Sequence, residues 1–409
     1  MRTTTAAAVL LSLVSAAQAN RNTLSCVDPA SVDYTKDYFP DKVTNNFSKL
    51  WEITYFNTYK VLKNKSTDKS YAFYQCGTEL PAGVAEQHED TWSVPLQDGI
   101  ALTATTTIPH LEQLGARRQV KGYLGNPSQI SSPCMQTLAQ ESDGEGSKVL
   151  QAVNDPLMAS WAQTPDGIPK ADFIAANPEV VILKAYGTGN QTLNWNAYEE
   201  DGNKATYEWH KVMGALFNLE KLANEQFDAS SDRFDCASDN SAYLLSEQSS
   251  STRRLSEPTR ALAETDSAAK PTVLWASPAY YGGWDIARCD AAQEYYCEFA
   301  TACSATLLHA NSGTIPVGSY EPDGFHMTLE EFVEFGKDAD YWIYSNFLYG
   351  DMETALAGDK GWAEISQFKS VKNGNVYDLQ KSGTGPWFES RVAEYGKFIF
   401  FCMRHTSIQ

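Results

Sequence analysis

The sequence predicts an α/β protein in which two α/β halves are joined by one long helix. Three observations support this prediction. Short apolar strands alternate with helical segments, which is typical of sheets with parallel strands. The alternation stops at residues 229–270 and starts again at Pro271. Between the halves, Ala205–Phe227 carries apolar residues at helical spacing and contains no proline. The length of 409 residues has room for two domains of roughly 150 residues each.

The first half is predicted to begin with a β-hairpin and to continue as an α/β sheet. Trp51–Leu62 and Tyr71–Gln75 are rich in aromatic and β-branched residues, and the polar stretch Lys63–Ser70 separates them. The polar residues 20–50 before the hairpin are predicted to form an irregular lead-in. The predicted strands that follow are Gly99–Thr105, Gln119–Leu124 and Val180–Leu183, and the predicted helices are Ile108–Leu114 and Ile168–Ala176.

The second half is predicted to follow a polar linker or insertion at residues 229–270, which is rich in Ser, Thr, Glu and Arg. Thr328 and Glu331 form a capping-box pattern at the start of a helix. The predicted strands are Thr272–Ala276, Tyr341–Tyr344 and Gly374–Leu379, and the predicted helices are Glu294–His309, Thr328–Phe335 and Trp387–Phe401. The expected domains are a signal peptide at 1–19, an N-terminal lobe at 20–204, an interlobe helix at 205–228, the polar linker at 229–270 and a C-terminal lobe at 271–409.

The first residues are typical of a secretory signal peptide. Arg2 is the only charge before residue 20, Ala6–Val14 is apolar, and Ala17-Gln18-Ala19 fits a cleavage site. The chain has 8 cysteines, an even number that favours disulfides, although their pairing is open. Three glycosylation sequons begin at Asn46, Asn64 and Asn190. We therefore expect a disulfide-bonded glycoprotein that is secreted or held at the cell surface.

The charge balance and the motif content argue against several classes of function. The formal net charge is −19, and a protein that binds nucleic acid needs a basic face. No HExxH, GxSxG, Walker A or GxGxxG pattern occurs, so the sequence carries no familiar enzyme motif. The 6 histidines include His110 at the start of the first-half helix, His210 in the long helix and His326 before Thr328. Direct metal binding by these histidines is less favoured than a structural role.

Several segments together resemble one known family. The resemblance is to class III periplasmic substrate-binding proteins, the binding components of vitamin B12 and iron–siderophore ABC transporters. It covers about residues 50–402 apart from the 229–270 stretch. Phe368–Tyr377 (FKSVKNGNVY) is the most specific match, because it is similar to the family's KAVKNGRVY segment. The other matching segments are IALTAT (100–105) with VKGY (120–123), DFIAANPEVVIL (172–183) and TLEEFVEFGKDADYWIY (328–344).

The resemblance implies a fold and a function. The family fold has two α/β lobes joined by a long rigid helix, with the ligand held in a cleft between the lobes. The segments at 271–284 and 295–316 resemble algal cobalamin-acquisition proteins. The implied function is the capture of a scarce nutrient, cobalamin first, for an unidentified membrane uptake system, without catalysis and without a cofactor. The alternatives are a ferric-siderophore or iron-binding protein and, less favoured, a secreted enzyme.

The candidate ligand-binding residues follow the predicted strands, because ligands of open α/β sheets bind beyond the carboxyl ends of the strands. Aromatic rings recur at these positions, and a large, partly apolar ligand such as a corrinoid suits them. Packing in the core is an equally good interpretation for any single one of them. Few basic residues follow the strands (Lys184 and Arg288), which favours a neutral ligand. The candidates are Thr105, Thr106, Tyr186, Tyr280, Tyr281, Trp284, Phe347 and Trp387.

Overall fold

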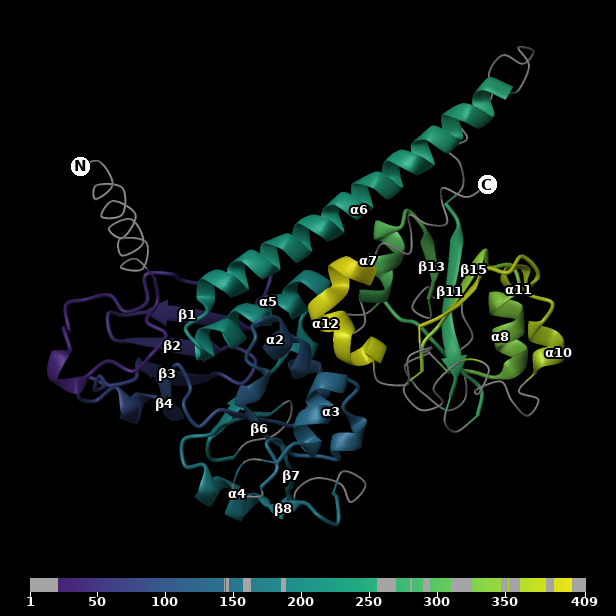
Figure 1. Cartoon of the computed structure of the whole chain (residues 1–409). Helices are drawn as coiled ribbons and strands as arrows, with labels where there is room; N and C mark the ends of the chain where they lie inside the picture. Colours follow the sequence, from purple (N-terminus) through teal and green to yellow (C-terminus); the bar gives the residue numbers. More distant parts are fainter. Residues whose placement is uncertain are drawn as a thin grey trace, which may run out of the picture. The chain divides into compact units, whose positions relative to one another are not determined.

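The computed structural model divides into two compact units (Figure 1). The N-terminal unit comprises Met1–Ala197 and Tyr207–Phe227, and the C-terminal unit comprises Tyr198–Thr206 and Asp228–Gln409. The structure describes residues 21–142, 144, 147–156, 163–184, 189–255, 270–279, 282–289, 295–309, 326–346, 352, 361–379 and 386–398. Each unit contains a sheet with parallel strands and helices, so the predicted α/β class is confirmed.

The N-terminal unit begins with a four-stranded sheet in the order β1-β2-β3-β4. The predicted hairpin is therefore too simple: Trp51–Leu62 forms two strands with a turn at residues 56–58, and a fourth strand adds in parallel to β3. After this turn, β2 runs back antiparallel to β1, so the residues of the two strands pair one to one. The strands are β1 (Trp51–Tyr55), β2 (Tyr59–Asn64), β3 (Lys69–Gln75) and β4 (Asp90–Val94).

The second sheet of this unit has six parallel strands in the order β10-β9-β5-β6-β7-β8. Hydrophobic residues cover both of its faces. In β9, Val181 and Leu183 belong to the large core on one side, whereas Ile182 packs with Phe173 on the other. Gly122 in β6 is needed because a Cβ there would lie 2.7 Å from the Phe173 ring. The elements are β5 (Ile100–Leu102), α2 (Ile108–Gln113), β6 (Val120–Tyr123), α3 (Pro133–Gln140), β7 (Gln151–Asn154), β8 (Ile168–Pro169), α4 (Lys170–Ala176), β9 (Val181–Lys184) and β10 (Thr192–Asn194).

The predicted long helix is two helices, α5 (Gly202–Leu216) and α6 (Glu220–Leu255). The chain turns at Asn218, whose φ of 57° is left-handed, and the Leu219 amide donates to the Gly214 carbonyl at 2.8 Å. Asparagine is the residue after glycine that most readily ends a helix in this way. The prediction of one helix over Ala205–Phe227 was wrong because the apolar spacing continues through this cap.

The polar stretch after residue 228 is helical as far as Leu255, and residues 256–269 lie outside the described part. The prediction of a polar linker or insertion was wrong for residues 229–255 in that they continue a regular helix, although many of their side chains are exposed. One face of α6 is mostly buried. The residues on this face lie three or four positions apart and are Ser230, Phe234, Ala237 and Ser241. Phe234 packs against Phe299 and Tyr395. Small residues make this face, so the sequence shows little apolar periodicity.

The C-terminal unit contains a mixed sheet in the order β14-β12-β11-β15-β16, with β13 also pairing β11. β13, β15 and β16 run parallel to their partners, and β12 and β14 are antiparallel. The predicted capping box is present, because Thr328 Oγ1 accepts from the Glu331 amide and Glu331 accepts from the Thr328 amide. The elements are β11 (Thr272–Pro278), β12 (Trp284–Ile286), α7 (Tyr295–Ala302), β13 (Thr306–Leu308), β14 (His326–Met327), α8 (Leu329–Gly336), β15 (Tyr341–Tyr344), α10 (Trp362–Ile365), α11 (Lys369–Lys372), β16 (Val376–Asp378) and α12 (Pro386–Phe398).

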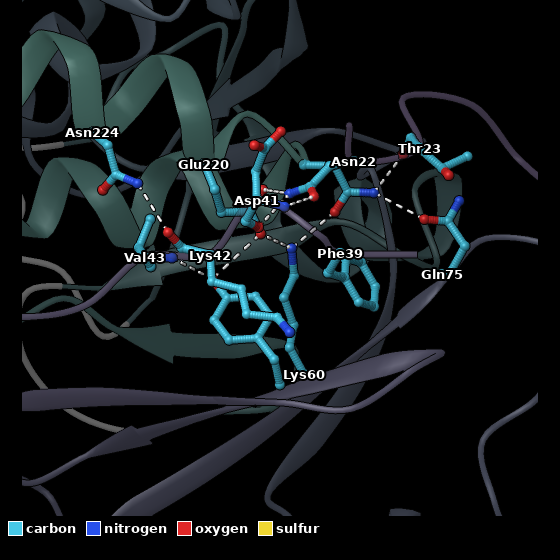
Figure 2. A network of polar contacts seen from close by, with 12 residues as sticks. Asn22, Thr23, Phe39, Asp41, Lys42, Val43, Lys60, Gln75, Glu220 and Asn224 are labelled. Carbon is cyan, nitrogen blue, oxygen red and sulfur yellow. Dashed lines mark hydrogen bonds and ion pairs between the residues drawn. The ribbon is translucent and has the colours of Figure 1, made fainter. Parts of the chain in front are cut away.

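A buried ion pair joins the first sheet to the helices of the N-terminal unit (Figure 2). Lys60 Nζ lies 2.5 Å from Glu220 Oε1, and both side chains are fully buried. Lys60 also donates to Asn218 Oδ1 at 2.8 Å, and Asn22 donates to Glu220 Oε2 at 2.6 Å. Burial lowers the pKa of Lys60 and raises that of Glu220, and the attraction between the two opposes both shifts. Removing either charged group would therefore leave its buried partners without an ion pair or a hydrogen bond.

The polar residues before β1 are irregular, as predicted, but they are firmly attached. The Glu208 carboxylate on α5 accepts hydrogen bonds from the amides of Asn46, Phe47 and Ser48 at 2.8, 2.8 and 2.7 Å. Lys211, one turn further on, donates to Glu208 at 2.9 Å and to the Thr44 carbonyl at 3.0 Å. Backbone groups of the segment therefore attach it to α5. Because every residue has such backbone groups, the sequence gives no sign of this attachment.

Disulfides are present, as the even cysteine count predicts. Cys26 pairs with Cys76 and Cys289 with Cys297, and Cys303 is also disulfide-bonded. Cys134 and Cys236 are free and exposed. None of the helices in the described ranges combines the length with the apolar character needed to cross a bilayer.

We expect the replacement Lys60→Met or Glu220→Gln to lower the free energy of unfolding by about 3–5 kcal/mol, because each leaves a buried charge or its partners unpaired. Urea unfolding monitored by circular dichroism measures this. The matched control is Lys65→Met, which removes the exposed Lys65–Glu52 pair at 3.0 Å and is expected to cost less than about 1 kcal/mol. Equal losses for the buried and the exposed pair would contradict the role assigned to Lys60.

Of the three sequons, we expect Asn64 to carry no glycan in the folded protein. Its side chain is fully buried and donates to the Asn194 carbonyl at 3.0 Å and to Asn196 Oδ1 at 2.8 Å. A sugar on Nδ2 would remove these bonds. Asn46 and Asn190 are exposed. Peptide mapping of protein secreted from a eukaryotic host tests this, with Asn46→Gln as the control, and a glycan found on Asn64 would refute it.

Candidate functional site

The N-terminal unit reverses its strand order at β5 and β9. From β5 the chain builds β6, β7 and β8 in one direction and then returns to place β9 on the other side of β5. At such a reversal the connections leave the sheet in opposite directions, so the carboxyl ends of the two strands form the usual ligand-binding edge. Thr103 bridges these ends, because its amide and its hydroxyl both donate to the Leu183 carbonyl at 3.1 and 3.2 Å.

Two predicted site residues lie at this edge. Thr105 and Thr106 begin a short 3-10 helix directly after β5 and are partly exposed. Thr107 is buried, and its hydroxyl donates to the Ala104 carbonyl at 2.7 Å, so it serves the turn. Lys184, the last residue of β9, is mostly buried at 7% exposure. The turn uses the hydroxyl of Thr107, whereas the hydroxyls of Thr105 and Thr106 are not used by this turn.

The C-terminal unit has a comparable reversal at β11 and β15. β12 and β13 pair with one side of β11, and the chain then crosses to place β15 on the other side. Asn346, just after β15, donates to Ser277 Oγ at 3.1 Å and to the Pro278 carbonyl at 2.8 Å. Ser345 accepts from the Trp275 indole at 2.9 Å. As in the N-terminal unit, side chains at the end of one strand are bonded to the end of the other.

Aromatic residues surround this second edge on one face of the sheet. We call Trp275, Tyr295, Tyr296, Phe299 and Trp387 the C-terminal aromatic cluster. Trp275 contacts Tyr296 and Trp387 with ring centroids 4.7 and 5.5 Å apart. Trp387, a predicted site residue, is buried at 3% exposure. Tyr295 and Tyr296 were missed because they fall at the start of a predicted helix rather than after a strand.

The structure corrects the expected position of Trp284. Sequence analysis places it in the segment that follows a strand, whereas it is the first residue of β12 and lies in the hydrophobic core. Its ring stacks on Phe332 with centroids 4.0 Å apart and an interplanar angle of 5°. Leu274 belongs to the same core, so the adjacent Trp275 and its partner Trp387 lie on the opposite face of the sheet. The structure therefore does not bring Trp284 and Trp387 together.

The remaining predicted site residues are Tyr186, Tyr280, Tyr281 and Phe347, and they lie outside the described residues. In the sequence, each of the four follows the carboxyl end of a strand that takes part in one of the two reversals. Their assignment as ligand contacts stays a prediction, like that of Thr105, Thr106 and Trp387.

The histidines of the N-terminal unit form a buried pair. His110 Nδ1 lies 3.3 Å from His210 Nδ1, and both rings are fully buried. His210 Nε2 contacts Gln226 Oε1 at 2.8 Å. Burial lowers the pKa of His210 to about 4, and burial together with His210 lowers that of His110 well below its usual range. The two rings are thus neutral near pH 7, and the stacked ring of Tyr207 covers both of them.

In the C-terminal unit, His326 Nδ1 lies 3.1 Å from Asp285 Oδ1 across the β12–β14 pair. No group of three or more His, Cys, Asp or Glu side chains in the described part of the chain is placed to hold a metal ion.

The comparisons with known proteins give structural matches only. No family model matches the sequence, and no curated protein matches it significantly. A periplasmic binding protein from Veillonella parvula is 11% identical with a TM-score of 0.42, covering 76% of this chain and 92% of that one. A periplasmic heme-binding protein from Pseudomonas aeruginosa is 11% identical with a TM-score of 0.44, covering 75% and 93%. The periplasmic vitamin B12-binding protein of Vibrio cholerae is 12% identical with a TM-score of 0.43, covering 76% and 98%.

We expect acid to destabilise the N-terminal unit through His210. The unfolded histidine has a pKa near 6.5 and the folded one a pKa of about 4, so the unfolded state binds more protons between these values. Stability is therefore lost as the pH falls from about 7 to 4, by about 3 kcal/mol for this group. Urea unfolding at pH 7 and pH 4.5 measures the loss, and His210→Gln should reduce it. The control is His88→Gln at a partly exposed site. An unchanged pH dependence in His210→Gln would contradict the assignment.

Proposed function

We propose that this chain is a secreted or cell-surface substrate-binding protein that captures a scarce nutrient and delivers it to a membrane uptake system. The observation that carries the proposal is that each unit contains an α/β sheet whose strand order reverses at one point. At each point polar side chains gather at the carboxyl ends of the strands, Thr103, Thr105 and Thr106 in one unit and Ser277 and Asn346 in the other. Binding is the usual function of such edges.

The ligand that we propose is cobalamin. The support comes from the resemblance of the sequence segments and from the chemistry of the two edges. A corrinoid carries many amide groups around a flat ring, so hydroxyl side chains such as those of Thr105 and Thr106 suit its rim. The rings of the C-terminal aromatic cluster are mostly buried, so they support the second edge from within the unit rather than as an exposed surface. The protein contributes binding and orientation, without catalysis.

The alternative ligand is a ferric siderophore or iron. The same edges suit a hydroxamate shell, which also presents carbonyl groups to hydrogen-bond donors. A secreted enzyme is the third possibility and would require a titratable group within reach of a bound substrate. The two nutrient-binding alternatives differ in which small molecule binds, so one set of ligands separates them.

The first experiment titrates the mature chain with cyanocobalamin, ferrichrome and ferric chloride while tryptophan fluorescence is recorded. We expect saturable quenching by micromolar cyanocobalamin, because Trp275 and Trp387 lie in the aromatic cluster next to the second edge. Saturation by ferrichrome or iron in its place would establish the alternative. If none of the three ligands binds at micromolar concentration, the proposed function is wrong.

The second experiment tests the first edge. We expect Thr106→Val to weaken cobalamin binding about fivefold, which corresponds to the loss of one hydrogen bond of about 1 kcal/mol. The matched control is Thr137→Val on α3, where the exposed hydroxyl donates to the Pro133 carbonyl of its own helix. Equal affinities of the Thr106→Val protein and the wild type would remove this residue from the site.

A further inference from the structure

Arg391 lies against the C-terminal aromatic cluster with its guanidinium group over a tyrosine ring. Its Cζ is 3.6 Å from the ring centroid of Tyr295, a close cation–π contact. Tyr295 is the first residue of α7, and Arg391 belongs to the second turn of α12. Tyr295 in turn contacts Tyr296 with ring centroids 4.1 Å apart. The arginine is thus held by a ring whose position is fixed by the packing of two helices.

The guanidinium group has no anionic partner in the described part of the chain. The ion pairs found among those residues do not include Arg391, and its Nε is buried without a hydrogen-bond acceptor. A guanidinium group has five N–H donors in one plane, and a carboxylate or phosphate normally occupies them when arginine is largely covered. Burying such a donor without an acceptor costs free energy. Arg391 is therefore placed to receive an anion that the described residues do not supply.

The arginine is connected to the ligand-binding edge of its unit. Tyr296, beside Tyr295, packs on Trp275, and the Trp275 indole donates to Ser345 at the carboxyl end of β15. Trp387, one helical turn before Arg391, packs on the same Trp275. A group bound at the end of β15 thus lies beside the cluster that carries Arg391.

We propose that Arg391, stacked on Tyr295, binds a singly charged oxyanion of the ligand, a phosphodiester or a carboxylate. This inference rests on the proposed function and deepens it. Cobalamin carries one such group, the phosphodiester of its nucleotide loop. The expectation of a neutral ligand rests only on the basic residues that follow strands. Arg391 was not counted, because it is contributed by a helix.

The test compares two corrinoids that differ in this group. Cyanocobalamin has the phosphodiester, and dicyanocobinamide lacks the whole nucleotide loop. We expect Arg391→Met to weaken cyanocobalamin binding roughly tenfold to a hundredfold, as the loss of a charged hydrogen bond does, and to change cobinamide binding less than about twofold. Arg391→Lys should restore part of the affinity. The control is Arg118→Met, which removes an exposed pair with Glu141 in the other unit. Thermal unfolding checks that each variant is folded.

Equal losses for the two corrinoids would overturn the proposal and leave Arg391 a structural role in the cluster. If the wild type binds neither corrinoid, the proposed ligand fails, and inorganic phosphate then decides about Arg391. Phosphate should raise the melting temperature of the wild type above that in chloride of equal ionic strength, and should not do so for Arg391→Met. The absence of this difference would overturn the inference whatever the ligand is.

Discussion

The N-terminal unit depends on one buried cluster of charge, formed by Lys60, Asn218 and Glu220. Lys60 comes from the second strand of the chain, whereas Asn218 and Glu220 lie at the junction of α5 and α6. Burying an ammonium and a carboxylate is unfavourable unless their hydrogen bonds are met, so the cluster tolerates few arrangements of strand and helix. It fixes where α5 ends, because the left-handed residue that ends the helix also accepts a hydrogen bond from Lys60.

The two proposed ligand-binding edges arise from the same topological feature in sheets of different composition. One sheet is entirely parallel and the other is mixed, yet each changes direction beside a central strand. In both, a side chain beyond one strand bonds the end of its neighbour, Thr103 to Leu183 and Asn346 to Ser277. These bonds connect the residues at the carboxyl ends of the two neighbouring strands. In the C-terminal unit, Arg391 adds a positive charge beside the aromatic cluster.

Much of the secondary structure followed from local pattern. The strand at Tyr341–Tyr344 and the capping box at Thr328 occur as predicted, because alternation and capping depend on residues close in sequence. The predictions failed where distant groups decide. The α5–α6 break depends on a cap that also bonds a strand, and the face of α6 is made of small residues that only tertiary packing identifies. At the site, Thr105 and Thr106 lie where the strand-end rule expects them, whereas Trp284 is taken up by stacking on Phe332.

The sequence by itself determined the α/β class, the order of most elements and the presence of disulfides, since periodicity, capping and cysteine content are properties of the chain alone. Only the tertiary structure decided which strands meet at each reversal, that Asn64 is buried, and that Arg391 faces a tyrosine ring with no ion-pair partner among the described residues. These facts depend on contacts between residues far apart in the chain, such as the 96 positions from Tyr295 to Arg391. No local pattern records such a contact, because its free energy exists only when both partners are in place.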